Sequence, residues 1–264
     1  MSKRLIIHLA VAFLVFFAWP IVSLCQSNTS GSDTEKLKAE QAWEAVVKAK
    51  GGRERLQAVQ NVIIESGKPA TAIWLFAFPD KYWRWTSEGP GPVPWSSMIF
   101  YNGEPHTYYW ITQDKTIRDT ADPQRAMNRE TALYLLETSW LKPEIVSVQR
   151  VRDGDHLLDV IETRVNGERL DFAVEVEQML VLKVMWYGRK VTRKKPLNTY
   201  LFSDYGPENG IQMPHGEQMV DDGDKMRKRT LYYRFNVEYD KDFFKRPPPL
   251  SAGPDAWKPK RQVP

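Results

Sequence analysis

Cysteine and histidine are scarce in this chain of 264 residues. Cys25 is the one cysteine, so no intramolecular disulfide can form. None of the four histidines stands at metal-ligand spacing from another histidine, a cysteine or a carboxylate, which disfavours a zinc site. The sequence has neither a Gly-rich nucleotide-binding loop nor a Gly-x-Ser-x-Gly nucleophile motif. We therefore expect a protein that is not an enzyme, without catalytic residues, cofactor or metal.

Long apolar runs are also few, and the longest stands at the N-terminus. It extends from Leu5 to Leu24 behind Lys3 and Arg4, a pattern typical of a signal peptide. A membrane anchor of about 20 residues is the alternative, but the polar linker 26–32 favours cleavage after Cys25. Acylation of Cys25 is less favoured, because Leu24 replaces the small residue that a lipoprotein signal needs before the cysteine. The sequence predicts an exported, periplasmic protein without residues 1–25.

In the remainder of the chain, runs in which apolar residues recur at every second position are the dominant pattern. A helix is expected over 33–50, ended by Gly51 and Gly52, with a short turn at 53–58. Asn-Gly and Asp-Gly pairs between several runs predict hairpins, and hence an antiparallel meander. The strands are expected at 59–66, 71–78, 81–88, 96–102, 105–111, 145–152, 156–165, 169–177, 180–187, 198–205, 211–220 and 226–239.

One helical segment, Gln124 to Leu141, interrupts the strands. Its apolar residues must cover part of the sheet, because they have no other partner. Two interpretations stay open: a helix that completes the core, or a lid over a cavity.

The basic excess of the chain, 37 Lys and Arg against 33 Asp and Glu, lies outside its body. The signal segment holds Lys3 and Arg4, and the Pro-rich tail 245–264 holds five basic residues against one acidic residue. We expect this tail to be extended and mobile. The remaining body is slightly acidic, so nucleic acid is not an expected partner. The tail and the basic loop 188–196 are candidates for contact with a membrane surface or an envelope protein.

Aromatic residues are abundant, and they occur on both sides of some strands. In 73–78, Ile73, Leu75 and Ala77 alternate with aromatic residues, whereas a half-exposed strand would alternate with polar ones. A thick core is one explanation, and a groove for an acyl chain or an apolar peptide is the other. The candidate ligand-binding residues are Trp74, Phe76, Phe78, Trp83, Trp85, Phe100 and Trp110 on strands, with Leu133, Leu136 and Trp140 in the lid.

Several short motifs, together with the order of the elements, resemble the LolA-like superfamily of periplasmic lipoprotein carriers, or outer-membrane lipoprotein-sorting proteins. The motifs are Phe78-Pro79-Asp80-Lys81-Tyr82-Trp83-Arg84, Phe100-Tyr101-Asn102-Gly103, Phe202-Ser203-Asp204-Tyr205, Gly210-Ile211-Gln212-Met213-Pro214 and the stretch 236–243 before Pro247. The resemblance covers residues 33–247 and implies a mainly β, α+β fold. It further implies an antiparallel half-barrel of about eleven strands, with the N-terminal and mid-chain helices over its concave face. The tail is an addition to that plan.

The resemblance implies a carrier of lipid, of lipoprotein acyl chains or of other hydrophobic ligands across the cell envelope. Phe78 stands where the carrier family has a basic residue, which favours general hydrophobic-ligand binding over lipoprotein shuttling. An envelope sensor or adaptor, whose domain 33–244 binds a protein partner, is the alternative function.

Overall fold

A computed structural model describes residues 29–88, 95–104, 109–112, 116–118, 123–189 and 194–259. The chain divides into two compact units, Met1–Thr34 and Glu35–Pro264. In the first unit the described residues form the start of helix α2, and all other described residues belong to the second unit. The expected signal peptide 1–25 lies outside the described residues. Helix α2 begins at Thr29, so the stretch 26–32 is not wholly the linker expected.

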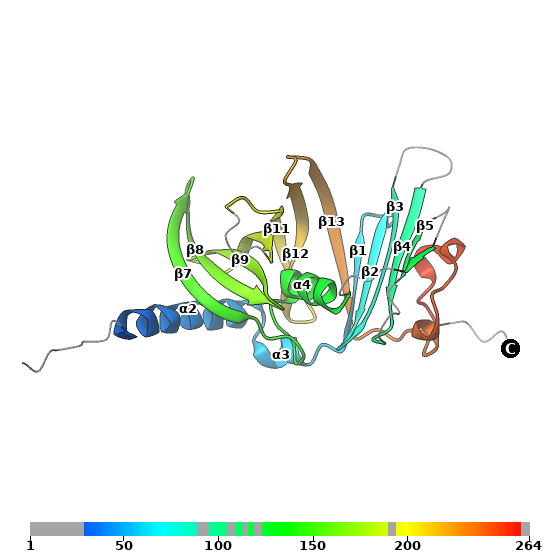
Figure 1. Ribbon diagram of the computed structural model, residues 1–264, viewed down its shortest axis with the longest axis horizontal. Helices are drawn as coiled ribbons and strands as arrows, with labels where there is room; N and C mark the ends of the chain where they lie inside the picture. Colours follow the sequence, from blue (N-terminus) through cyan, green and yellow to red (C-terminus); the bar gives the residue numbers. More distant parts are fainter. Residues whose placement is uncertain are drawn as a thin grey trace, which may run out of the picture. The chain divides into compact units, whose positions relative to one another are not determined.

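The helices and strands follow the predicted order (Figure 1). The helices are α2 (Thr29–Lys50), α3 (Arg53–Gln57) and α4 (Pro123–Leu135), with 3-10 helices η1 (Phe243–Lys245) and η2 (Leu250–Asp255). The first strands are β1 (Asn61–Ser66), β2 (Ala72–Ala77), β3 (Lys81–Glu88), β4 (Trp95–Tyr101), β5 (Tyr109–Thr112) and β6 (Thr116–Arg118). The later ones are β7 (Glu144–Asp153), β8 (His156–Val165), β9 (Glu168–Glu175), β10 (Val181–Gly188), β11 (Asn198–Glu208), β12 (Ile211–Asp221) and β13 (Met226–Phe235).

All described strands belong to one antiparallel sheet, in the order β6-β5-β4-β3-β2-β1-β13-β12-β11-β10-β9-β8-β7. The chain winds from β1 out to β6, reaches β7 at the opposite end through α4, and returns to pair β13 with β1. The predicted mainly β fold, an open antiparallel sheet with an N-terminal and a mid-chain helix, is confirmed. The sheet has thirteen strands rather than about eleven, and the three-residue β6 is too short for an alternating pattern to show.

One face of the sheet, here the inner face, packs on the helices. Trp43 of α2 makes an edge contact with Phe172 of β9, at 5.2 Å between ring centroids. Tyr134 of α4 lies 6.2 Å from the ring of Phe202 on β11. Phe172 on β9 lies opposite Val184 on β10, and Val184 lies opposite Tyr200 on β11. Tyr200 and Phe202 are two residues apart on β11, so their side chains point to the same face as Phe172. Both helices therefore cover the same face.

The end of α2 is fixed by a close backbone approach. Gly51 has a φ of 139°, and a Cβ built there would lie 2.6 Å from the carbonyl oxygen of Gly210 in the β11–β12 turn. A side chain would collide with that carbonyl, so glycine both stops the helix and lets it meet the turn.

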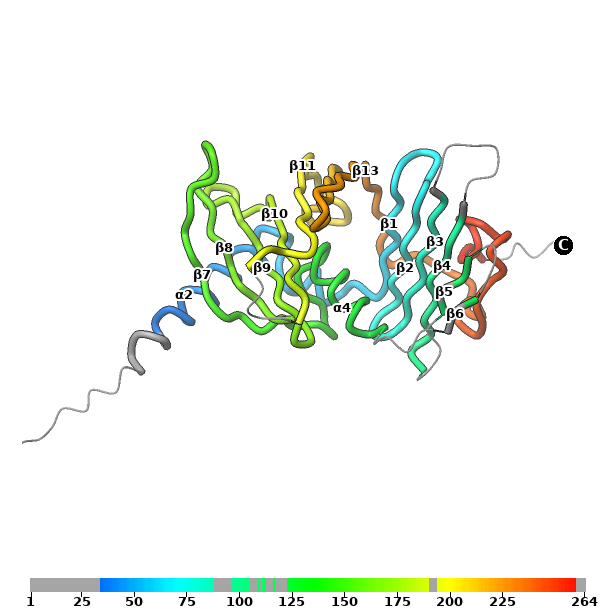
Figure 2. The backbone as a smooth tube through the Cα atoms, turned by 45° about the horizontal axis from the view of Figure 1, so that its top comes forward, coloured from blue at the N-terminus to red at the C-terminus, as the bar shows by residue number. Residues whose placement is uncertain are grey.

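The opposite, outer face of β1 to β4 has a core of its own, and the tail covers it. Phe243, Phe244 and Trp257 are buried in one cluster with Trp83 and Phe100. The backbone of this C-terminal segment, coloured orange to red, runs beside the end of the sheet that holds β3 and β4 (Figure 2). We call residues 243–257 the C-terminal strap. The expectation of a mobile tail from residue 245 is wrong up to Trp257, because Trp257, together with Phe243 and Phe244 just before the tail, buries enough apolar surface to hold the segment in place.

Candidate functional site

The mid-chain helix lies on the inner face of the sheet and defines the candidate site. α4 starts with Pro123 at its first turn, a favoured position for proline. It ends before Leu136, whose φ of 66° breaks the helical path. The expected helix, 124–141, is therefore shorter, and residues 136–141 continue as coil. We call residues 123–141 the lid segment.

Apolar side chains from both sides fill the contact between the lid segment and the sheet. Met127, Leu133 and Leu136 are buried in the same cluster as Trp74 and Phe76. The exposed fractions of Trp74 and Phe76 are 4% and 1%, so protein atoms surround both rings. In this state there is no room for a ligand beside these two rings, and a ligand could reach them only if the lid segment moved.

Polar contacts also join α4 to the sheet. The hydroxyl of Tyr82 on β3 donates a hydrogen bond of 2.7 Å to Glu130. The hydroxyl of Tyr134 donates one of 2.6 Å to Glu217 on β12, which also lies 2.9 Å from Arg229 on β13. Burial, with the nearby Glu217 carboxylate, raises the pKa of Tyr134 well above its ordinary value, so its hydroxyl stays a donor.

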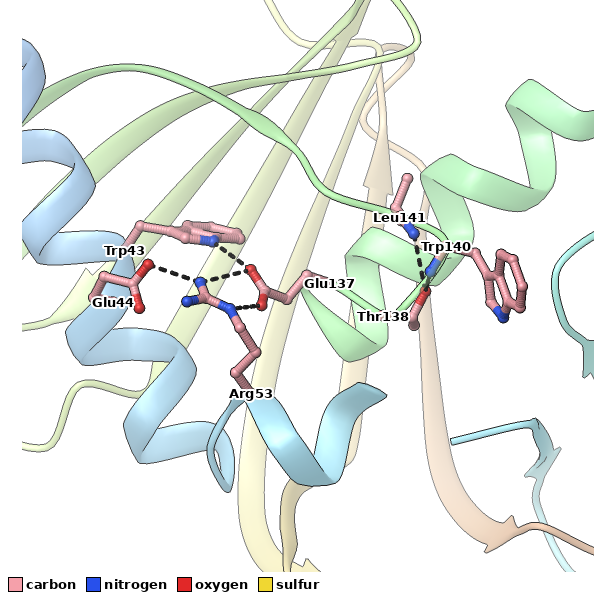
Figure 3. Close-up of polar contacts among 7 residues, drawn as sticks. All are labelled: Trp43, Glu44, Arg53, Glu137, Thr138, Trp140 and Leu141. Atoms are coloured by element: carbon pink, nitrogen blue, oxygen red, sulfur yellow. Dashed lines mark hydrogen bonds and ion pairs between the residues drawn. The ribbon is translucent and has the colours of Figure 1, made fainter. Parts of the chain in front are cut away.

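A buried carboxylate anchors the end of the lid segment to both N-terminal helices (Figure 3). Glu137 is 2% exposed and accepts hydrogen bonds from Arg53 Nε at 2.6 Å and from Trp43 Nε1 at 3.2 Å. Arg53 on α3 also bonds Glu44 on α2, at 2.7 Å. The hydrogen bonds to Glu137 and then to Glu44 raise the pKa of the Arg53 guanidinium. This ion pair therefore closes the lid segment against α2 and α3.

An open cleft lies next to this anchor. The cleft has a volume of about 620 Å³, within the usual range for small-molecule sites. Leu37 and Trp43 of α2 face Pro143 and Ile145 at the start of β7, and charged side chains form the rim. Leu37 is 54% exposed there. Trp43 and Arg53 belong both to the cleft wall and to the anchor on Glu137.

The structure brings together only part of the predicted ligand-binding set. Trp74 and Phe76 on β2, with Phe78 just beyond it, lie with Leu133 and Leu136 in the inner-face cluster. Their role in binding a ligand stays a prediction.

The other predicted residues lie elsewhere. Trp83, Trp85 and Phe100 point to the outer face, where the C-terminal strap covers them, because successive side chains on a strand alternate between faces. Trp140 is 64% exposed, and its ring points away from the Glu137 anchor (Figure 3). Trp110 is on β5, but its side chain lies outside the described part of the chain.

Sequence reasoning missed Leu37, Trp43, Arg53 and Glu137. Leu37 and Trp43 carried a local signal, since both are apolar residues at helical spacing in the expected helix. Arg53 and Glu137 are 84 positions apart, and no local pattern links them.

The basic loop 188–196 is described only in part. Residues 190–193 lie outside the described ranges. Lys195 donates a hydrogen bond of 2.9 Å to the backbone oxygen of Asp222 and lies 3.5 Å from the Asp224 carboxylate. Its contact with a membrane or an envelope protein stays a prediction.

Two negative findings hold for the described ranges. No three or more His, Cys, Asp or Glu side chains gather there in a way that could hold a metal ion. No helix within those ranges has the length and apolar character that crossing a membrane requires.

Comparisons by sequence found no matching family model and no matching curated protein. By structure, the chain is similar to a domain of a putative outer membrane lipoprotein-sorting protein from Vibrio parahaemolyticus, with 12% identity, coverage of 78% of this chain and 97% of the other, and a TM-score of 0.45. A DUF1329 family protein from Desulfovibrio piger (9%, 78% and 96%, TM-score 0.41) and a LolA superfamily protein from Nitrosomonas europaea (14%, 75% and 96%, TM-score 0.40) are also similar. Two of these names, a lipoprotein-sorting protein and a LolA superfamily protein, belong to the group that the sequence motifs resemble. At such identities and TM-scores, the functions of these proteins do not carry over to this chain.

Proposed function

We propose that this protein is a non-catalytic, exported binding protein that carries a hydrophobic ligand, such as a lipid or an acyl chain, between the inner face of its sheet and the lid segment. The cleft between α2 and the start of β7 carries this proposal. It presents Leu37, Trp43 and Ile145 to a space of about 620 Å³, and two residues of its wall bond the end of the lid segment.

In this proposal, the packed contact between α4 and the sheet is the closed state of the carrier. An apolar chain that entered from the cleft would replace the contacts between α4 and residues such as Trp74 and Phe76. Each methylene group buried in this way contributes about 0.8 kcal/mol. A long chain therefore offsets both the lost packing of α4 and a few hydrogen bonds of about 1 kcal/mol each.

The direct test is to identify what the protein carries. Protein purified from its own compartment is examined by native mass spectrometry and lipid extraction, and the empty protein is titrated with a fluorescent fatty acid. The proposal expects a co-purified apolar molecule or saturable uptake. Recovery of no lipid, together with no uptake, contradicts it.

Two leucine variants test whether the ligand enters through the cleft. Leu37→Glu puts a charge into the cleft at a side chain that is 54% exposed, so the fold should tolerate it. Leu157→Glu makes the same change at a side chain on β8 that is 37% exposed and does not line the cleft. Uptake should fall at least about tenfold in the first variant, since burying a charge costs more than 1.4 kcal/mol, and stay unchanged in the second. Equal uptake by both variants contradicts a role for the cleft.

The packing of the tail argues against one part of the alternative function, in which an adaptor docks through a mobile basic tail. The tail is packed through Trp257, and its aromatic residues face the sheet.

A further inference from the structure

Trp140 is the most exposed large hydrophobic side chain in the described part of the chain. It is 64% exposed, against 56% for Met226, 54% for Leu37 and 37% each for Val146 and Leu157, and it is the aromatic one among them. A single exposed apolar residue is ordinary on a protein surface. Trp140 differs from the others in how its backbone is held and in what lies beside it.

A tight turn holds Trp140 in this position (Figure 3). Thr138 is 4% exposed, and its Oγ1 accepts hydrogen bonds from the backbone N–H of Trp140 at 3.2 Å and from that of Leu141 at 3.1 Å. The N–H of Thr138 donates a bond of 2.9 Å to the carbonyl oxygen of Leu141. Glu137 precedes the turn in its buried ion pair, and Leu141 ends the turn in the inner-face cluster. Both ends of the turn are fixed, so the exposed indole stands on a rigid base.

The turn places Trp140 beside the cleft between α2 and the start of β7. Burial alternates after it, since Leu141 and Pro143 are buried, whereas Lys142 and Glu144 are exposed. Trp140 and Lys142 therefore lie on the same, solvent-exposed side of the segment. Two residues of chain span at most about 7 Å, and Lys142 lines the cleft. The indole thus stands near the mouth of the cleft.

Charged side chains at the rim of the cleft are available to a partner. Lys36, Glu40, Lys142 and Glu144 line the cleft and are exposed. None of these four side chains has an ion pair or a hydrogen bond within the ranges that the structure describes. Two are cations and two are anions, so the rim matches a surface that carries charges of both signs.

The surface of a zwitterionic phospholipid bilayer has this character. Each headgroup carries a phosphate, which a lysine can bind, and a cationic amine, which a glutamate can approach. Tryptophan is enriched at this level of a membrane, because its ring is apolar and its indole N–H finds an acceptor there. A stable protein interface needs a cluster of buried anchor residues, whereas one indole among charges of both signs suits a reversible contact with lipid.

We propose that Trp140 and the charged rim of the cleft dock on the surface of a zwitterionic phospholipid bilayer, and that the ligand passes between bilayer and cleft at this contact. This inference rests on the proposed function and names the membrane as the source of the ligand. Trp140 is three residues from Glu137, so a bilayer that holds the indole acts directly beside the anchor of the lid segment.

Vesicle binding tests the docking itself. The purified protein is sedimented with sucrose-loaded vesicles of phosphatidylcholine and phosphatidylethanolamine. Trp140→Ala should lower the partition onto the vesicles at least about tenfold, because about 100 Å² of apolar surface no longer leaves water. Trp140→Tyr keeps an amphipathic ring and should bind within about threefold of the natural protein. The matched control is Met226→Ala on β13, at the next most exposed side chain, which should leave binding unchanged.

Transfer kinetics test whether the ligand passes at this contact. Protein loaded with a fluorescent fatty acid is mixed with an excess of the same vesicles. If transfer occurs during docking, its rate should rise with the vesicle concentration. In Trp140→Ala the rate should be lower and independent of vesicle concentration, because the ligand then leaves through water, while the affinity for the fatty acid in water stays unchanged.

The outcomes separate this inference from the proposed function. If the protein binds no fatty acid in water, the proposed function is wrong, whatever the vesicles show. Absence of vesicle binding, or vesicle binding and transfer that Trp140→Ala leaves unchanged, overturns the docking and leaves the carrier function intact. Dimerisation that Trp140→Ala abolishes, measured by analytical ultracentrifugation without vesicle binding, would show a contact between copies of this chain and also overturn the inference.

Discussion

Arg53 and Glu137 join parts of the chain that are 84 residues apart, with Arg53 Nε 2.6 Å from Glu137 Oε1. The carboxylate side chain is 3% exposed and the guanidinium side chain 36% exposed, so the pair lies at the border between core and solvent. It holds the end of the lid segment to α3, and through Trp43 to α2. A carrier that opens at this lid has to break this contact.

Glu137→Gln should weaken the closed state. It removes the charge from a buried ion pair, which costs about 3–5 kcal/mol where both partners are buried and less here, because Arg53 is partly solvated. We expect a loss of about 1–2 kcal/mol in the free energy of unfolding, measured by urea titration, together with faster uptake of a fluorescent fatty acid. The matched control is Glu44→Gln, since Glu44 binds the same arginine with a side chain that is 57% exposed. This control should change stability by about 0.5 kcal/mol or less, and equal losses in both variants would contradict the anchoring role.

The inner side of the lid segment should matter far more than its exposed tryptophan. Leu133→Ala removes a buried side chain from the inner-face cluster and should cost about 2–5 kcal/mol in the free energy of unfolding. Trp140→Ala should cost about 0.5 kcal/mol or less and leave fatty-acid uptake unchanged, because Trp140 is 64% exposed. Both are measured by urea unfolding and probe binding. Loss of uptake in the Trp140 variant would contradict this prediction and show that Trp140 contributes to ligand binding.

The C-terminal strap should stabilise the outer face. Phe243 is 6% exposed and makes an edge contact with Trp83 at 5.4 Å. Phe243→Ala should cost about 3 kcal/mol and shift tryptophan fluorescence to longer wavelength, as water reaches the outer-face core. Lys245→Ala, at a side chain that is 73% exposed, is the control and should do neither. If Phe243→Ala changes neither the free energy of unfolding nor the fluorescence, the strap does not stabilise the outer face.

Lys50 gives the protein a pH dependence. Burial lowers the pKa of this lysine from 10.5 to about 7 in the folded state, and its Nζ lies 5.9 Å from the ring centre of Tyr205. Between those two pH values the unfolded chain holds a proton that the folded chain has released. The free energy of unfolding should therefore rise as the pH increases from about 7 toward 10.5.

A methionine variant isolates this effect. Lys50→Met should be more stable than the natural protein near pH 7, and the difference should shrink as the pH rises. Lys48→Met, at an exposed lysine in the same helical turn, should leave the pH profile as it is. Urea titrations across this pH range measure all three proteins, and parallel profiles would show that Lys50 titrates normally.

The strands and the two apolar faces could be predicted because alternation is a local pattern. In 72–77, every side chain is buried, as the aromatic and aliphatic alternation of Ile73 to Phe78 implies. What covers each face could not be predicted. Phe243 and Phe244 stand just before a run of prolines, Trp257 stands between two prolines, and no periodic pattern links the three. Their burial against Trp83 and Phe100 therefore depends on the tertiary fold alone.

The same limit applies to the candidate site. The sequence shows the lid segment as an apolar helical stretch, but α4 ends before Leu136, where no glycine marks the end of the helix. The ion pairs of Glu137 and Glu168 depend on arginines from other elements or on a strand register that only the folded sheet sets. The sequence therefore predicts a helix over an apolar sheet, and the structure adds how that helix is fastened.

In the proposed function, a hydrophobic ligand displaces the lid segment from the inner face of the sheet. Hydrogen exchange of the purified protein, measured with and without saturating palmitate, tests it most directly. We expect saturable binding, with faster exchange in residues 123–135 and in the coil up to Leu141, while the amides of β9 to β12 stay protected. Absence of binding, or binding with unchanged exchange throughout α4, would contradict it.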